Sequence, residues 1–233
     1  MLIGLLSDAH GNLEAFRQAV ALLRRLGAQR LYFLGDAVGY LPGMAVVDEI
    51  LLEGFDALMG NHEDMLLQQA PISPARDDLY RLMPMRAAVT DVQREIVSQW
   101  PRARKLDAAC GSVMLFHGSP VSPTNGYVYP DTALDDFSID PGSIVFMGHT
   151  HHPFQRQKNG VRYVNVGSCG LPRDAGALGC AALLDDETGA VRLLRFDIRA
   201  ATAAALARVG DVHPAVRAVF DRPTPAGLVG DLI

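Results

Sequence analysis

Five short apolar runs, each bounded by glycine and carrying a potential metal ligand, constrain the fold of this chain more than any other feature. Residues 31–34 lead into Gly35 and Asp36, and the pattern recurs at residues 3–10, 56–62, 113–118 and 144–151. Apolar runs of this length next to glycine favour buried strands over helices. Because ligands of open α/β sheets collect beyond the carboxyl ends of strands, the five segments predict a cluster centred on Asp36.

The whole chain has the composition of a folded, water-soluble protein. Its 233 residues are 49% apolar and 20% charged, and the net charge of -5 offers no basic surface to nucleic acid or anionic membranes. No apolar run approaches the roughly 20 residues of a membrane helix, and the first residues lack the pattern of a signal peptide. Three cysteines without a CxxC pair fit free thiols. A cytoplasmic protein is therefore expected.

The first half of the chain predicts alternating strands and helices. Strands are expected at residues 2–6, 30–34 and 55–59, with helices at 12–26 and from Pro42 to about residue 53 between them. Residues 63–101 are expected to form a mainly helical insert broken by prolines. The β-α-β-α-β order predicts a parallel or mixed sheet covered by helices.

The second half is strand-rich. Strands are expected at residues 105–110 and 112–116 about a turn at Cys110 and Gly111, and at 143–147. Two hairpins follow: 154–157 with 161–166, turning at Asn159-Gly160, and 178–184 with 190–196. A helix at 198–209 and a loosely determined tail at 214–233 complete the prediction. One α/β (α+β) domain with a second sheet packed on the first is expected over residues 1–233.

Histidines gather in the five ligand-bearing segments. Six of the seven lie within or beside them, and a single histidine would more often be a core or surface residue than a ligand. Residues two apart in extended chain point to the same side, so Asp8 with His10, and His149 with His151, can each present two donors in one direction. Five unrelated strand ends would explain the glycines but not these histidines.

Together these residues resemble the calcineurin-like dimetal metallophosphoesterases. The stretch from Gly35 to Tyr40, and Asn165-Val166-Gly167-Ser168 before Leu171-Pro172-Arg173, resemble the small bacterial and archaeal members of phosphodiesterase type. The matching motifs, in the order of the family, are Asp8-Ala9-His10, Gly35-Asp36, Gly60-Asn61-His62-Glu63, His117-Gly118 and Gly148-His149-Thr150-His151. The resemblance implies a four-layer α-β-β-α sandwich with two packed mixed sheets.

The resemblance also implies a binuclear metal centre. One ion would be held by Asp8, His10, Asp36 and His151, and the other by Asp36, Asn61, His117 and His149, so that Asp36 bridges. His62 would act on the substrate as the catalytic residue. Mixed imidazole and carboxylate ligands suit Mn, Fe, Zn or Ni better than Mg or Ca, and Mn is the first expectation.

The expected reaction is hydrolysis of a phosphodiester or a small phosphorylated metabolite. Two divalent ions and two ligand carboxylates leave a charge of about +2, which favours an anionic substrate. A water shared by two ions would attack phosphorus in line, while His62 protonates the departing oxygen or stabilises its charge.

The second motif differs from that of the phosphoprotein phosphatases, and this difference ranks the alternative activities. Phosphoprotein phosphatases of the superfamily continue the second motif as Gly-Asp-x-x-Asp-Arg-Gly, whereas here Ala37-Val38-Gly39-Tyr40 follows, without the arginine. Protein dephosphorylation therefore ranks below phosphodiester hydrolysis, and dinucleoside polyphosphate hydrolysis remains an alternative. A non-catalytic protein-binding scaffold is the alternative from another class, and the presence of His62 beside a complete ligand set favours an enzyme.

Several residues outside the ligand set are candidates for weaker roles. Asn61, His62, Tyr40 and Arg173 are candidate substrate contacts, although a solvated position is the more expected one for Arg173. Tyr127 and Tyr129 lie in a loop at residues 119–130 that is expected to wall the pocket, and packing is favoured for them over substrate contact. Asn165, Gly167 and Ser168 could support the metal site through a turn, but an ordinary turn that ends a strand is at least as expected. The helical insert is a candidate surface for a homodimer.

Overall fold

A computed structural model describes residues 1–68 and 70–233 and contains two packed mixed sheets. The first sheet has the order β11-β10-β9-β1-β2-β3, and its strands are β1 (Leu2–Leu6), β2 (Arg30–Phe33), β3 (Asp56–Ala57), β9 (Leu178–Asp185), β10 (Val191–Asp197) and β11 (Asp231–Leu232). The second has the order β4-β5-β6-β8-β7, with β4 (Ala103–Ala108), β5 (Gly111–Phe116), β6 (Ile144–Met147), β7 (Phe154–Lys158) and β8 (Val161–Asn165). The predicted α/β class with two mixed sheets is confirmed.

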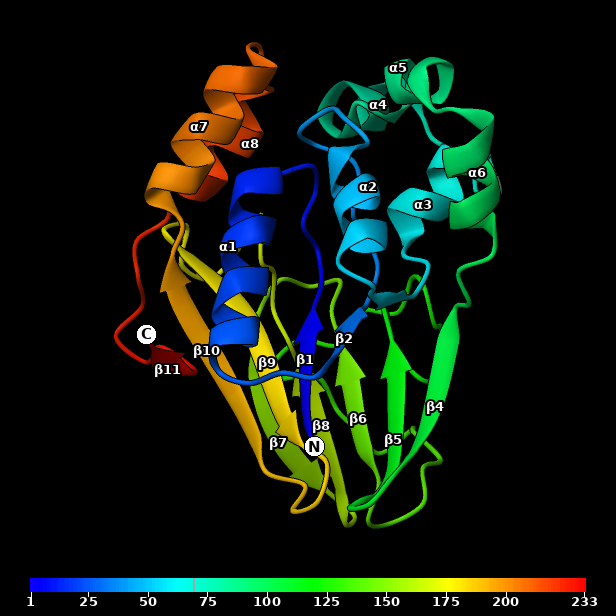
Figure 1. The fold of residues 1–233 in the computed structure, drawn as a ribbon, viewed down its shortest axis with the longest axis vertical. Helices are drawn as coiled ribbons and strands as arrows, with labels where there is room; N and C mark the ends of the chain where they lie inside the picture. The colour runs from blue at the N-terminus through cyan, green and yellow to red at the C-terminus, as the bar shows by residue number, and fades with distance from the viewer. Residues whose placement is uncertain (69) are drawn as a thin grey trace.

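The central strands of each sheet run parallel. β1, β2 and β3 pair in parallel, as do β5, β6 and β8, whereas β9 and β7 run antiparallel to their neighbours. The arrowheads of β1, β5 and β6 point toward the helical part of the molecule (Figure 1). The loops that leave these strands therefore meet at one end of the sandwich.

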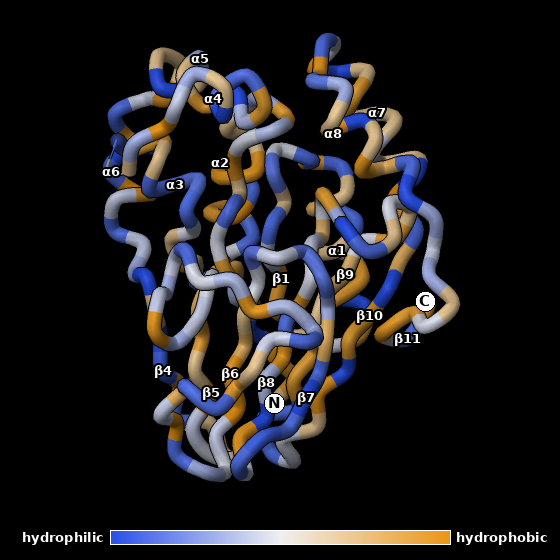
Figure 2. The backbone as a smooth tube through the Cα atoms, turned by 180° about the vertical axis from the view of Figure 1, so that it is seen from behind, coloured by the Kyte–Doolittle hydropathy of each residue, from blue (hydrophilic) through white to orange (hydrophobic). Residues whose placement is uncertain are grey.

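Apolar side chains from facing strands fill the space between the sheets. Leu5 and Tyr32 of the first sheet belong to one buried cluster with Leu115, Phe146 and Val164 of the second. The orange strands in the middle of Figure 2 follow this core. Alternate residues of the same strands, such as Phe33, turn to the outer face, where helices cover them.

Helices cover the outer face of the first sheet. In α1 (Leu13–Arg25), Phe16 and Leu23 lie on the buried face, and the side chain of Asn12 caps the helix by accepting from the Ala15 N–H at 3.2 Å. α2 (Ala45–Leu52) contributes Val47 and Ile50 to the same cluster, and α7 (Arg199–Val209) lies beside α1 (Figure 1).

An irregular segment covers the outer face of the second sheet. Val128 and Leu134 of residues 117–143 pack against Val145 and Met147 of that sheet. The α-β-β-α sandwich led us to expect helix on this side, whereas residues 117–143 contain none. Prolines at 120, 123, 130 and 141 explain the difference, because proline interrupts a regular helix.

Four helices fill the segment predicted to be a helical insert. They are α3 (Asn61–Leu66), α4 (Pro74–Tyr80), α5 (Leu82–Ala88) and α6 (Asp91–Ser98). Residue 69, which falls inside the predicted insert, lies outside the described residues. α3 begins at Asn61, inside a ligand motif, so the helical segment starts at the site itself.

Three local predictions are wrong. α2 begins at Ala45 and not at Pro42, and the turn between β4 and β5 ends at Cys110, so Gly111 already belongs to β5. The tail is ordered: α8 (Pro214–Phe220) buries Val216, and β11 pairs in parallel with β10. Pro214 at the first position of α8 and the cap from His213, which accepts from the Ala215 N–H at 3.1 Å, explain this helix.

Among the described residues, no helix has both the length and the apolar character needed to cross a bilayer.

Candidate metal centre

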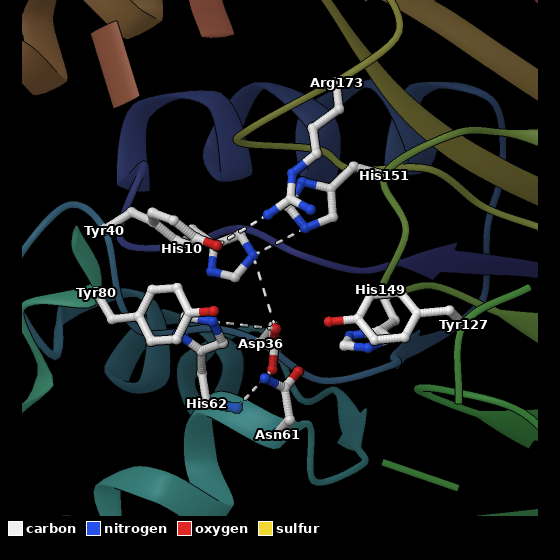
Figure 3. A pocket seen from close by; sticks show the side chains of 10 residues that line it. All are labelled: His10, Asp36, Tyr40, Asn61, His62, Tyr80, Tyr127, His149, His151 and Arg173. Carbon is white, nitrogen blue, oxygen red and sulfur yellow. Dashed lines mark hydrogen bonds and ion pairs between the residues drawn. The ribbon is translucent and has the colours of Figure 1, made fainter. Parts of the chain in front are cut away.

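The seven predicted metal ligands and the predicted catalytic residue, His62, come together at the carboxyl ends of the strands. They follow β1 (Asp8, His10), β2 (Asp36), β3 (Asn61, His62), β5 (His117) and β6 (His149, His151). Six of them line a pocket of about 50 Å³ with Tyr40, Tyr80, Tyr127 and Arg173 (Figure 3). Asp8 and His117 are fully buried against these side chains.

The loops that carry these residues adopt an uncommon backbone conformation. φ is positive at Asp8, His10, Asp36, His149 and His151, between 48° and 66°. Aspartate and histidine tolerate the left-handed region better than most residues, but such conformations still carry strain. Strained backbone at five of the predicted ligands is typical of a functional site that the surrounding fold holds in place.

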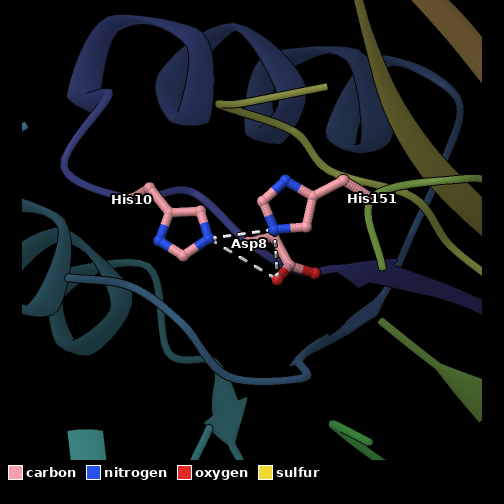
Figure 4. Close-up of side chains that lie close together, drawn as sticks. All are labelled: Asp8, His10 and His151. Atoms are coloured by element: carbon pink, nitrogen blue, oxygen red, sulfur yellow. Dashed lines mark hydrogen bonds and ion pairs between the residues drawn. The ribbon is translucent and has the colours of Figure 1, made fainter. Parts of the chain in front are cut away.

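The first group of donors contains Asp8, His10 and His151 (Figure 4). His151 Nε2 lies 3.1 Å from Asp8 Oδ1 and 3.1 Å from His10 Nε2, and His10 Nε2 lies 3.7 Å from the same carboxylate oxygen. The other oxygen, Asp8 Oδ2, accepts from the His149 N–H at 3.0 Å. One oxygen of Asp8 is thus fixed by backbone and the other faces two imidazoles.

The second group contains Asp36, His117 and His149. His117 Nε2 lies 3.0 Å from His149 Nδ1, 3.1 Å from Asn61 Oδ1 and 3.4 Å from Asp36 Oδ2. Asp36 Oδ2 also lies 3.7 Å from His10 Nε2. Asp36 therefore stands between the two groups, as a bridging ligand would.

Backbone carbonyls fix the orientation of three imidazoles. The Nδ1 atoms of His10, His117 and His151 lie 3.0, 2.9 and 2.5 Å from the carbonyl oxygens of Val38, Leu34 and Leu171. A carbonyl only accepts, so each Nδ1 carries the proton, and the Nε2 of a neutral ring turns its lone pair toward the centre.

This arrangement of donors favours a cation at the centre. The Nε2 lone pairs of neutral His10 and His151 would face each other at 3.1 Å. Asp8 Oδ1 and His149 Nε2 are buried without a hydrogen bond within the part of the chain that the structure describes. Buried polar atoms without partners are costly, and a cation satisfies several of them at once. The residues therefore fit two divalent ions.

The pKa shifts agree with ionised carboxylates and mostly neutral imidazoles. Burial alone would raise the pKa of Asp36, but the surrounding histidines outweigh it and hold that pKa well below its usual range. Burial lowers the pKa of His149 to about 3 and that of His151 to about 4. His117 differs: burial opposes its charge, but Asp36 beside it raises its pKa to about 9.

His62 occupies a tightly packed place beside the two donor groups. Its ring lies 4.6 Å from that of Tyr80 and stacks on Tyr40 at 5.1 Å, with Nε2 3.8 Å from Asp36 Oδ2. Gly39, at φ 91°, passes so close that a Cβ there would lie 2.1 Å from His62 Nδ1. Only glycine fits so close to the His62 ring, which gives Gly39 a physical role.

Arg173 lines the pocket, contrary to the solvated position expected for it. It is half-buried, and its guanidinium donates to the Tyr40 hydroxyl at 2.8 Å. The pairing holds both candidate substrate contacts at the mouth of the pocket, with further guanidinium N–H groups left to donate. Tyr80 also lines the pocket and was missed, because a tyrosine at the end of a helix in the insert carries no motif.

Asn165 and Ser168 hold the loops that carry the candidate metal ligands, which is one of the two roles that the sequence left open for this turn. Asn165 Nδ2 donates to the Gly148 carbonyl at 2.6 Å, and the Ser168 hydroxyl donates to the Asp8 carbonyl at 2.7 Å. Cys169 is fully buried, and the ring of His152 turns back onto the Thr150 carbonyl, with Nδ1 2.7 Å away. None of these four residues lines the pocket.

Glu63 supports the site, although its place at the end of the Gly60–Glu63 motif did not predict a role for it. Its buried carboxylate accepts from the N–H groups of Asp36, Ala37 and Gly60, each at 2.8 Å. Burial and the charge of Asp36 raise the pKa of Glu63 to about 7, although the N–H groups of Asp36 and Gly60 act to lower it. Glu63 therefore ties the Asp36 loop to the start of α3, which carries Asn61 and His62.

Glu63→Ala should destabilise the protein strongly. It leaves three buried N–H groups without a partner, so we expect the free energy of unfolding to fall by about 3–5 kcal/mol. Chemical denaturation followed by circular dichroism measures this change. Glu187→Ala, at an exposed glutamate, is the control and should stay within about 0.5 kcal/mol of the parent protein. Equal stability of the two variants would refute the supporting role.

Comparison with known proteins shows the family to which this chain belongs. A model of the calcineurin-like phosphoesterase superfamily domain matches residues 1–189. The chain is 23% identical over 220 residues to an uncharacterized protein of Methanocaldococcus jannaschii, spanning 86% of this chain and 90% of that protein. The fold of the present chain is similar to that of a metallophosphoesterase from Sphaerobacter thermophilus, with a TM-score of 0.77 and 23% identity. The match covers 95% of this chain and 99% of the other. A hypothetical protein from Pyrococcus horikoshii has the same TM-score of 0.77 at 17% identity, with coverage of 94% and 97%. Because the family match spans most of its length, the chain belongs to the calcineurin-like phosphoesterase superfamily.

Proposed function

We propose that this protein is a metal-dependent hydrolase that cleaves a phosphodiester or a small phosphorylated metabolite. The observation that supports it most is the convergence of imidazole lone pairs and two ionised carboxylates on one buried centre. Such a donor set is suited to two divalent ions, and a centre of net positive charge draws an anionic phosphoryl group.

The proposed ligands divide between two ions. Asp8, His10, Asp36 and His151 would hold one, and Asp36, Asn61, His117 and His149 the other. When bound, the ions supply the charge that neutralises phosphoryl oxygens and makes water acidic enough to act as a nucleophile. Mixed nitrogen and oxygen donors favour Mn, with Fe, Zn or Ni as alternatives.

His62 is proposed to act on the leaving group. Its Nε2 faces the centre at 3.8 Å from Asp36 Oδ2, and its ring is held between Tyr40 and Tyr80. Burial lowers the pKa of His62 to about 3, so the imidazole is neutral in the protein without metal or substrate. The negative charge of an incoming phosphate opposes that shift and favours the protonated ring.

The pocket favours a small phosphoryl group over a bulky one. Its volume is about 50 Å³, well below the roughly 300–1,000 Å³ of pockets that hold drug-sized ligands, and two ions would occupy part of it. Dinucleoside polyphosphates or phosphoproteins, the alternative substrates, would leave most of their bulk outside. We place the protein in the cytoplasm, in keeping with three free cysteines at positions 110, 169 and 180.

Arg173 is proposed to bind a phosphoryl oxygen, which predicts a measurable loss in its variant. Arg173→Gln removes a charged donor, so kcat/KM for a phosphodiester should fall by about 10- to 100-fold. Steady-state kinetics measures the loss. Arg222→Gln is a matched control, because Arg222 donates to the Arg173 carbonyl from an exposed position and does not line the pocket. An unchanged kcat/KM in Arg173→Gln would remove Arg173 from substrate binding.

A simple assay tests the proposed function. The purified protein is first stripped of metal and then given bis-p-nitrophenyl phosphate or p-nitrophenyl phosphate, with and without Mn. We expect Mn-dependent release of nitrophenolate, faster from the diester than from the monoester. A faster reaction with the monoester would indicate a phosphomonoesterase. No Mn-dependent release from either ester would favour the non-catalytic scaffold on this fold.

A further inference from the structure

Four of the six tyrosines of the chain lie at or next to the pocket, and two of them remain exposed. Tyr40 and Tyr80 are packed around His62, whereas Tyr127 and Tyr129 are 56% and 38% exposed. Large aromatic side chains usually bury their rings, so an exposed pair beside a candidate active site requires an explanation other than core packing.

The two exposed rings form a continuous surface that starts inside the pocket. Tyr127 lines the pocket, and its ring centroid lies 4.1 Å from that of His149 (Figure 3). The Tyr129 ring lies 6.1 Å farther on, nearly parallel to Tyr127 at 9°, and contacts the ring of His152 at 5.6 Å. We call Tyr127 and Tyr129 together the aromatic ledge.

The backbone holds both rings on the same side. Val128, between them, is buried against the second sheet, so its two neighbours must point away from the core. The Tyr129 N–H donates to the Thr132 hydroxyl at 2.8 Å, and the Thr132 N–H donates back to the Tyr129 carbonyl at 3.1 Å. The ledge is therefore preorganised, which lowers the entropic cost of binding a ligand on it.

We propose that the aromatic ledge binds a flat ring of the substrate, such as a nucleobase, while the phosphoryl group lies at the metal centre. This inference rests on the proposed phosphoesterase function and narrows its substrate to esters that carry a planar ring on the sugar or alcohol side. Every nucleobase has a π face that stacks on tyrosine, so the ledge selects for a ring and not for a particular base.

A matched pair of substrates tests the ledge. The methyl ester of adenosine 5′-phosphate and the methyl ester of ribose 5-phosphate are identical at phosphorus and differ in the base. Hydrolysis by the Mn-loaded protein is followed by phosphorus NMR. Stacking on an aromatic side chain predicts a preference for the adenosine ester of about 5- to 100-fold in kcat/KM.

Tyr129→Leu should reduce this preference at least about 5-fold, and Tyr129→Phe should keep it, because stacking needs the ring and not the hydroxyl. Val121→Ala, on the same loop and 69% exposed, is the control that should leave the ratio unchanged. The ledge is refuted if the parent protein shows no preference, or if Tyr129→Leu keeps it.

A second readout separates the ledge from the proposed function. If neither ester is hydrolysed, the phosphoesterase proposal fails, and calorimetric titration with adenosine 5′-phosphate and ribose 5-phosphate still tests the ledge. Tighter binding of the adenosine compound that Tyr129→Leu removes would support it. Equal affinities in the parent protein would overturn it.

Discussion

Asp36→Asn should remove bound metal and activity together, with turnover falling by about 10⁴-fold or more. Asp36 Oδ2 is the oxygen that lies between the two donor groups, 3.7 Å from His10 Nε2 and 3.4 Å from His117 Nε2. Asparagine has nearly the same shape and can still accept from the His62 N–H with its Oδ1, as the carboxylate does at 2.9 Å. The substitution therefore removes the charge with little change in packing.

Elemental analysis and steady-state kinetics on the same sample measure the outcome. The control is Asp107→Asn, on an exposed position of β4, which should keep both metal and activity. Circular dichroism shows whether the variant is folded. A folded Asp36→Asn protein that retains two ions and full turnover would exclude Asp36 as the bridging ligand.

His62→Gln should separate metal binding from catalysis. His62 lies at the start of α3 and contacts Tyr40 and Tyr80, but it is proposed to bind no ion. We expect unchanged metal content and a turnover lower by about 10²- to 10⁴-fold, the usual contribution of a general acid. His213→Asn is a matched control, because His213 caps α8 outside the pocket and asparagine also caps well.

The dependence on the leaving group identifies what His62 does. An alkoxide needs a proton to depart, whereas nitrophenolate leaves as a stable anion. His62→Gln should therefore slow methyl esters much more than nitrophenyl esters if the imidazole donates a proton. Equal losses of activity with methyl and nitrophenyl esters would indicate that His62 binds the phosphoryl group instead. Full activity with both kinds of ester would exclude a catalytic role for His62.

The grouping of the candidate metal ligands was predictable from sequence, because the segments that form the strand ends also carry these ligands. An apolar run such as residues 31–34 predicts a buried strand, and the parallel pairing of β1, β2 and β3 brings the loops after them together. Asp8 and Asp36 lie two and three residues beyond the ends of β1 and β2. Side-chain chemistry at such loops can be inferred without coordinates.

The backbone contacts that position the candidate ligands were not predictable in the same way. The carbonyls of Val38, Leu34 and Leu171 that orient three imidazoles carry no side-chain signal, since every residue has a carbonyl. Arg173 reaches the pocket because its backbone N–H bonds to the carbonyl of His151 at 3.3 Å, a tertiary contact. The order of the C-terminal tail also depends on pairing with a distant strand, β10.

Anomalous diffraction at the manganese edge from crystals grown with Mn tests the binuclear centre most directly. We predict two peaks about 3.5–4 Å apart. One should lie among Asp8, His10, Asp36 and His151, and the other among Asp36, Asn61, His117 and His149. The absence of any peak among these residues, or a peak only at another place in the molecule, would contradict the account.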